Sequence, residues 1–167
     1  YDKYEITDNT AQTFPWTRAD CTSTPGVCTR AEELQNFANW LQYYRNRRLM
    51  AKGGAADAFA RQGTALRTGF ARIGGSPVVR RGMRDFSDTV AGMYRTDFFN
   101  LLYNEPSANS TTPLRSAMDA VGQHFTTTDV NSPWAQSPGT SIGTEYTCRR
   151  SFHIMSTDGF WNNNAAS

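Results

Sequence analysis

Lysine is scarce in this 167-residue chain, because Lys3 and Lys52 are its only lysines among seventeen basic residues. The formal net charge is only +2, which is too small to indicate a nucleic-acid or membrane-surface partner. No run approaches the roughly 18 consecutive apolar residues of a membrane span, and no basic-then-apolar signal segment opens the chain. We therefore expect neither a nucleic-acid partner nor a membrane span.

Catalytic motifs are also lacking. His124 and His153 are the only histidines, and the chain contains neither a GxSxG elbow nor an HExxH string. A histidine between apolar residues, as His153 is between Phe152 and Ile154, is typically a packed and hydrogen-bonded core residue. The sequence therefore predicts a protein that is not an enzyme.

Cysteine is rare, with three residues in the whole chain. Cys21 and Cys28 bracket a turn-rich segment, which predicts a disulfide-closed loop and an oxidising compartment. Half of a zinc site is the weaker interpretation, because the spacing is too long for a CxxC knuckle. Cys148 is left over, as a free thiol or as the partner of a cysteine outside this chain. Its neighbours Arg149 and Arg150 are of the kind that activate a thiol.

What is present fits one core of ordinary size, since 38% of the residues are hydrophobic and 13% are aromatic. Residues 1–28 form a polar, turn-rich segment, and we expect a folded domain over residues 29–167. The chain begins at Tyr1 without Met. Because its opening resembles the interior of a protein, we expect it to be a processed or excised piece of a longer polypeptide.

A long helix is predicted after the cysteines. Thr29 and Glu32 form a capping-box signature at its start. Apolar residues then recur at helical spacing through Met50, namely Leu34, Phe37, Ala38, Leu41 and Leu49. The Tyr- and Arg-rich stretch 43–48 is interpreted as a solvated face. We expect residues 52–54 to interrupt this helix, with a further helical stretch over 55–60.

Three short apolar runs predict strands, at residues 66–73, at residues 78–79 before an arginine-rich polar loop, and at residues 152–155 as a buried strand. Helices alternating with such strands indicate an α/β layered fold. A sheet this small would leave open edges. We therefore expect further strands before Tyr1 and after Ser167.

Two more helices are predicted, around residues 97–103 and from Pro113 onward. The second has the clearest apolar stripe in the chain, formed by Leu114, Ala117, Met118, Val121 and Phe125. A polar stretch follows over residues 126–147. A loop of this length in a compact domain usually has a function or is mobile.

Thr112 and Asp158 form a candidate metal site. Thr112 directly precedes a proline-initiated helix, and Asp158 follows an apolar run that suits the end of a buried strand. Ligands of open α/β sheets bind at the carboxyl ends of strands, where the two residues would meet. The structural alternatives are a helix N-cap for Thr112 and a turn residue for Asp158.

Several motifs in order, between about Cys28 and Asn163, resemble the PilY family of type IV pilus tip-associated adhesin and assembly proteins. The motifs are Gln35-Asn36-Phe37-Ala38-Asn39-Trp40 with Tyr43-Tyr44-Arg45-Asn46-Arg47, Thr112-Pro113-Leu114-Arg115 with Ala117-Met118-Asp119-Ala120-Val121-Gly122, and Thr157-Asp158-Gly159-Phe160-Trp161-Asn162. The resemblance implies that residues 29–167 are part of an N-terminal von Willebrand factor A-like domain, which is a Rossmann-like three-layer α/β fold.

The resemblance also implies a divalent-cation site for Mg²⁺ or Mn²⁺. Such A domains use a DxSxS motif, a Thr in a second loop and an Asp in a third, and Thr112 and Asp158 match the second and third elements. DxSxS itself is absent, and the nearest string, residues 85–89, follows the strands in the wrong order. Two oxygen ligands fall short of the roughly six that such cations prefer, so we expect an incomplete site in this chain.

The resemblance predicts a non-enzymatic module at the tip of a bacterial pilus, on the extracellular surface and associated with the outer membrane. Its implied roles are surface attachment, pilus biogenesis and twitching motility, with a mechanosensory role as an extension. The implied partners are minor pilins and a surface or host ligand. The alternative is a generic secreted A-like protein-binding domain unrelated to pili.

Overall fold

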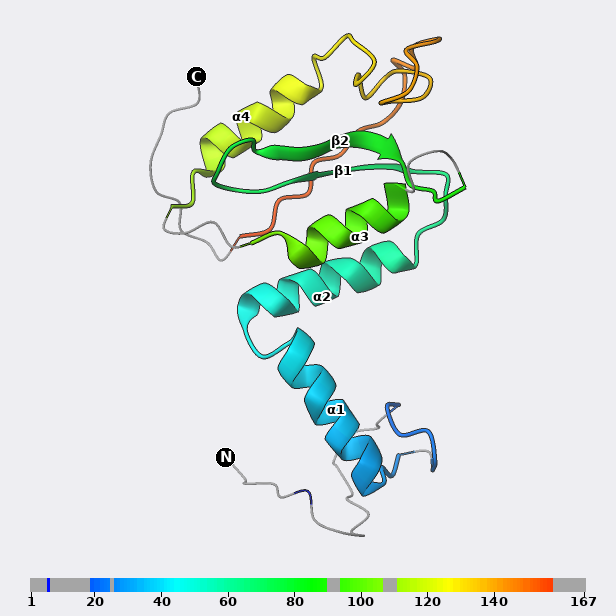
Figure 1. Cartoon of the computed structure of the whole chain (residues 1–167), viewed down its shortest axis with the longest axis vertical. Coiled ribbons are helices and arrows are strands. Elements are labelled where there is room, and N and C mark those ends of the chain that lie inside the picture. The colour runs from blue at the N-terminus through cyan, green and yellow to red at the C-terminus, as the bar shows by residue number, and fades with distance from the viewer. Residues whose placement is uncertain (1–5, 7–18, 25, 90–93, 107–110, 158–167) are drawn as a thin grey trace. The chain divides into compact units, whose positions relative to one another are not determined.

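The computed structural model describes residues 6, 19–24, 26–89, 94–106 and 111–157. The chain divides into two compact units, residues 1–54 and 55–167. The elements, in order, are α1 (Arg30–Tyr43), α2 (Arg47–Ala60), β1 (Arg67–Ala71), β2 (Val79–Asp85), α3 (Tyr94–Asn104) and α4 (Leu114–His124) (Figure 1). No helix in these ranges has both the length and the apolar character needed to cross a membrane.

The first unit contains α1 and the beginning of α2. The predicted capping box is confirmed, because the Thr29 hydroxyl accepts a hydrogen bond from the Glu32 amide and the Glu32 carboxylate accepts one from the Thr29 amide. The single helix predicted through Met50 is wrong, since α1 ends at Tyr43 and α2 begins at Arg47. The Asn46 side chain accepts a hydrogen bond from the Leu49 amide, which favours this new start.

The predicted interruption at residues 52–54 is also wrong, because α2 continues through Gly53 and Gly54. A Cβ atom at Gly53 would lie 3.1 Å from Cε1 of Tyr44. The glycine therefore leaves room for the Tyr44 ring against α2. Tertiary packing of this kind overrides the low helix propensity of glycine.

The sheet of the second unit is an antiparallel pair, in which Arg67 lies opposite Asp85 and Ala71 opposite Val79, with irregularities between. The strand predicted at residues 66–73 is confirmed. The second strand begins where expected but continues to Asp85, where a polar loop was predicted, so that part of the prediction is wrong. Two arginines of β2 form ion pairs with α3 and its end, Arg80 with Glu105 and Arg81 with Asp97. These pairs allow an arginine-rich segment to lie within the fold.

An aromatic cluster forms the core of the second unit. Its buried members are Ala56, Phe86, Phe98 and Leu102. The side chain of Phe86 is fully buried, and its ring centroid lies 6.1 Å from Phe59, 5.5 Å from Phe98 and 6.1 Å from Phe99. The rings meet edge-on or tilted, the arrangements that aromatic quadrupoles favour. The helix predicted at 97–103 is confirmed as α3, which supplies Phe98 and Leu102 to this cluster.

The sheet lies between α3 and α4, both of which contact it (Figure 1). The helix predicted from Pro113 is confirmed as α4, whose stripe buries Leu114 and Ala117 but leaves Met118 50% exposed. The described residues thus form a small α/β structure.

The C-terminal segment differs from its prediction. Residues 152–155 form no strand, and the side chains of Phe152 and Ile154 are each 80% exposed. His153 is exposed as well, so its interpretation as a core residue is wrong. A short apolar run becomes a buried strand only if a neighbouring strand pairs with it, and within the described part of the chain none does.

Candidate functional site

Of the two predicted metal ligands, Thr112 lies among the residues that the structure describes. Thr112 is partly buried immediately before α4, and its carbonyl oxygen accepts a hydrogen bond from the Leu114 amide. The N-cap position of α4 is Pro113, not Thr112, and it has no side-chain cap. Asp158 lies outside the residues that the structure describes. The metal site therefore stays a prediction.

The string nearest to DxSxS, residues 85–89, has structural roles instead. The Asp85 carboxylate accepts a hydrogen bond from Arg67 at 2.8 Å. The Asp88 carboxylate accepts hydrogen bonds from the Thr96 amide and hydroxyl at 2.9 and 3.0 Å, which caps the beginning of α3. Through these hydrogen bonds the two carboxylates hold parts of the fold together.

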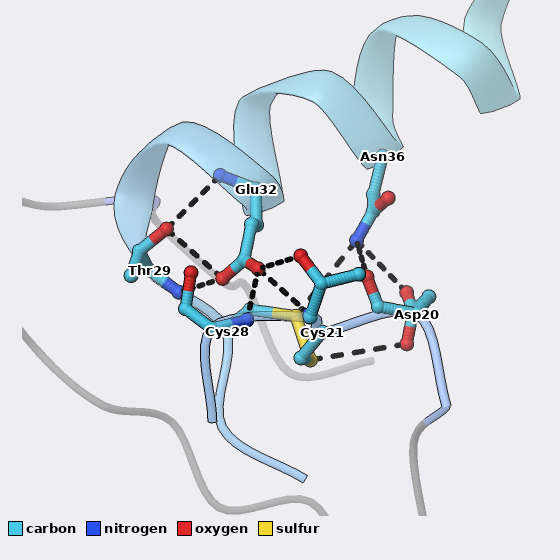
Figure 2. Close-up of a disulfide and its surroundings, with 8 residues drawn as sticks. Asp20, Cys21, Cys28, Thr29, Glu32 and Asn36 are labelled. Atoms are coloured by element: carbon cyan, nitrogen blue, oxygen red, sulfur yellow. Dashed lines mark hydrogen bonds between the residues drawn. A yellow bond between two sulfur atoms is a disulfide. The ribbon is translucent and has the colours of Figure 1, made fainter. Parts of the chain in front are cut away.

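A disulfide closes the loop before α1, as the sequence predicts. Cys21 and Cys28 are joined and buried (Figure 2). In the described part of the chain, they and Asp20 form the one cluster of His, Cys, Asp and Glu side chains close enough to hold a metal. Because both sulfurs are in the disulfide, neither is available as the thiolate that zinc requires.

Glu32 ties this disulfide loop to the first turn of α1 (Figure 2). One carboxylate oxygen accepts hydrogen bonds from the Thr22 amide and hydroxyl and from the Ser23 amide, at 2.7 to 2.8 Å. The other accepts from the amide and hydroxyl of Thr29. The Thr29 amide, followed by Ser23 and Thr22, holds the pKa of Glu32 far below its usual range. The charged carboxylate thus links the disulfide loop to the first turn of α1.

Asn36 attaches the same loop one turn further along α1. Its side-chain amide donates a hydrogen bond to the Asp20 carboxylate at 2.9 Å and makes a longer contact with the sulfur of Cys28 (Figure 2). The disulfide loop is therefore fixed to one end of the helix by polar contacts of short sequence separation.

In the second unit, Arg67 links the sheet to the 126–147 loop, and the sequence analysis missed this role. Its side chain is only 6% exposed and pairs with Asp85 across the sheet. The guanidinium also donates hydrogen bonds of 2.7 to 3.0 Å to the carbonyl oxygens of Pro133, Ala135 and Gln136. We call these five residues the Arg67 cluster. Arg67 holds a loop more than 65 positions away in sequence, so no local sequence pattern predicts the cluster.

The polar stretch 126–147 is a folded loop built on the Arg67 cluster. Ser132, Ala135 and Pro138 are fully buried within it. The Trp134 ring nitrogen donates to the carbonyl oxygen of Phe125 at 2.9 Å, and the Gln136 amide donates to that of Ile142 at 2.7 Å. The sequence predicted that this segment has a function or is mobile. In the structure it has a definite fold, which sets the positions of its outer residues.

The outer surface of this loop carries apolar and cationic side chains. Ile142 is 42% exposed and Tyr146 is 39% exposed. The guanidinium of Arg149 lies 4.9 Å from the centre of the Tyr146 ring, in cation–π geometry. We call Ile142, Tyr146 and Arg149 the outer loop surface. Aromatic side chains and arginine are enriched at protein–protein interfaces relative to other exposed surfaces.

His124 and the two carboxylates near it in sequence each make hydrogen bonds to other groups. Nε2 of His124 accepts a hydrogen bond from the Met83 amide. The Asp119 carboxylate accepts a hydrogen bond from Gln123, and that of Asp129 accepts one from the Asn131 amide. Cys148 is an exposed free thiol.

Comparison with known proteins finds three similar curated sequences, each named type IV pilus biogenesis factor PilY1, from strains of Pseudomonas aeruginosa. The strain PAK protein is 39% identical over 162 residues, which cover 88% of this chain and 14% of that protein. The PAO1 protein is 37% identical over 89% of this chain, and the UCBPP-PA14 protein is 34% identical over 76%. This chain covers 11 to 14% of these relatives' lengths. Neither a protein-family model nor a solved structure matches it.

Proposed function

Because the chain belongs to the PilY1 family of type IV pilus biogenesis factors, we propose that it is a non-enzymatic binding and assembly module at the tip of a bacterial type IV pilus. In this proposal it acts at the cell surface in attachment, pilus biogenesis and twitching motility. Minor pilins and a surface or host ligand are its partners. The observation that carries the proposal is the identity of 34 to 39% to three pilus biogenesis factors.

The outer loop surface is the proposed recognition surface of the module. Its support comes from the Arg67 cluster, in which one buried guanidinium fixes three carbonyl oxygens of the loop between Pro133 and Gln136. A loop that is already fixed loses less conformational entropy when it binds a partner. The loop also follows from the end of α4, so that one helix and one strand pair position it (Figure 1).

We further propose that residues 29–167 are part of a von Willebrand factor A-like domain and that Thr112 and Asp158 are cation ligands in the longer protein. The support is the match of these residues to two elements of the family motif. A single described hydroxyl does not make a cation site, so attachment does not depend on the metal in this proposal. Calorimetric titration of Mg²⁺ and Mn²⁺ tests it, with Asp158→Ala as the control and loss of binding in that variant as the expected result.

A mechanosensory role is proposed for the disulfide-closed loop. A covalent link between Cys21 and Cys28 keeps the intervening residues from extending under load. The residues between Cys21 and Cys28 could extend to about 25 Å, at about 3.6 Å per residue, and the Cα atoms of the two cysteines are 4.7 Å apart, so the closed loop withholds about 20 Å of chain. Single-molecule stretching should release that length only after reduction. An equal extension in reduced and oxidised protein would contradict this role.

Surface attachment tests the recognition surface in the bacterium that encodes the protein. We expect Tyr146→Ala combined with Ile142→Ser to reduce attachment several-fold while the number of surface pili stays normal. Met118→Ala is the matched control, because Met118 is a similarly exposed apolar residue on α4. Normal attachment by the double variant would place recognition elsewhere on the protein.

Deletion of the whole gene tests the pilus assignment separately. Loss of surface pili and of twitching is the expected result, and restoration by the wild-type gene is the control. If the deletion strain assembled pili and twitched normally, the pilus function itself would be wrong, whatever the loop variants do.

A further inference from the structure

His124, the last residue of α4, lies against the backbone of β2. Its Nε2 accepts a hydrogen bond of 3.1 Å from the amide of Met83, 41 residues earlier in the chain. The Met83 amide belongs to β2 of the two-stranded sheet, and it donates to a side chain and not to a third strand. The imidazole is half-buried there. A backbone donor in the sheet therefore depends on one acceptor that can be protonated.

Gly82 makes this close approach possible. A Cβ atom at that position would lie 2.7 Å from Cε1 and 3.1 Å from Nε2 of His124. Any larger residue would displace the ring from β2. The absence of a side chain at Gly82 therefore allows the end of α4 to pack closely against β2.

The charged groups around His124 come from two elements. Arg84 of β2 donates hydrogen bonds to the Met83 carbonyl oxygen at 2.8 Å and to Asn131 of the 126–147 loop at 2.9 Å. Asp129 of that loop is the neighbouring anion. Burial first, and then Arg84, lowers the pKa of His124, and these effects outweigh the attraction of Asp129. The C-terminal end of α4 also favours a cation, but that effect is small at a surface helix end.

We propose that His124 is a pH-sensitive latch between α4 and β2. The neutral ring accepts the Met83 hydrogen bond and holds the end of α4, with the start of the 126–147 loop, against the strand. Protonation places an N–H of the imidazolium opposite the Met83 N–H and a second positive charge beside Arg84. Two donors cannot hydrogen-bond to each other, so the contact opens and the Met83 amide becomes available to another strand.

The sign of the pH effect follows from the direction of the pKa shift. Because the folded-state pKa lies below the ordinary value of 6.5, the latch is fully closed above pH 6.5. Opening becomes more favourable as the pH falls from 6.5 toward the folded-state pKa, by up to about tenfold per pH unit, and then levels off.

Amide hydrogen exchange at Met83 tests the latch in the 167-residue chain. Protection is measured between pH 7.5 and pH 5.0 and corrected for the intrinsic pH dependence of exchange. We expect the protection of Met83 to fall as the pH drops below 6.5, by no more than about tenfold per pH unit, while that of the core residue Phe98 stays constant. His153→Gln, which removes the exposed histidine, should behave as wild type.

His124→Gln separates protonation from simple loss of the contact, because the glutamine carbonyl accepts a hydrogen bond and does not titrate. Its Met83 protection should show no step below pH 6.5. A step equal to that of wild type, or constant Met83 protection in wild type, would overturn the proposal. The imidazole nitrogen shifts of wild type give an independent test, since protonated Nε2 at pH 7.5 would also overturn it.

Discussion

The two units of this chain are stabilised in different ways. In the first, α1 buries no residue, and its N-terminal end is held by a disulfide and by hydrogen bonds between residues at most 16 positions apart. In the second, the aromatic cluster and the Arg67 cluster join segments far apart in sequence. The described end of α1 is held by covalent and capping contacts, whereas the second unit also has a buried core. Substitutions in one unit should therefore leave the other unchanged.

Removal of the central aromatic side chain should have the largest effect. Phe86→Ala empties a fully buried site and should lower the free energy of unfolding of the second unit by about 4 kcal/mol. Urea denaturation followed by residue-resolved hydrogen exchange measures it. Phe152→Ala, at an 80% exposed site, is the control and should change the free energy by less than about 0.5 kcal/mol. Equal effects would mean that the aromatic cluster is not the core.

Loss of the buried guanidinium should come next. Arg67→Ala leaves Asp85 and three carbonyl oxygens without their donor, which should cost about 3 kcal/mol and release the 126–147 loop. Hydrogen exchange of the loop amides measures the release. Arg61→Ala is the matched control, because the Arg61–Asp57 pair is exposed and should contribute under about 0.5 kcal/mol. A loop that stays protected without Arg67 would contradict its role.

Removal of the disulfide should affect the first unit alone. Cys21→Ser combined with Cys28→Ser frees a short loop and should destabilise the beginning of α1 by about 2 to 3 kcal/mol. Exchange of the amides at the start of α1 measures this loss. Cys148→Ser, at the exposed free thiol, should have no effect. If the second unit lost protection to the same extent, the two units would not be independent.

Neutralisation of Glu32 should have the smallest effect. Glu32→Gln replaces an acceptor oxygen with a donor amide and should increase fraying of the first turn of α1. Because the folded-state pKa of Glu32 is lowered, its contribution is present above pH 4.5 and is lost as the pH falls below it. Circular dichroism of α1 helicity against pH measures this. Glu33→Gln removes the same charge from the same turn and should leave the pH dependence intact.

The local elements were predictable because their causes lie within a few residues. The Thr29–Glu32 capping box, the stripe of α4 and the Cys21–Cys28 loop each depend on residues that are close in sequence. Element boundaries were less predictable. The helix α2 continues through Gly53, beside the Tyr44 ring, and pairing with β1 extends β2 to Asp85. Neither contact can be identified from spacing alone.

The candidate site was predictable only in part. Sequence motifs indicated the pilus family, and the similarity to three PilY1 proteins confirmed it. The predicted ligands Thr112 and Asp158 remain a prediction. The Arg67 cluster and the His124 contact had no signal in the sequence, because an arginine among many and a lone histidine have no characteristic spacing to their partners.

The sequence by itself determined where α1 begins, which cysteines pair and to which family the chain belongs. These properties arise from short-range hydrogen bonds, from chain closure over a few residues and from the order of motifs. Only the tertiary structure decided that Phe152 is exposed while Phe86 is buried, and that Arg67 holds a loop while Arg61 does not. Burial and long-range hydrogen bonds depend on which distant segments come into contact, and the pattern of residues along the sequence does not specify those contacts.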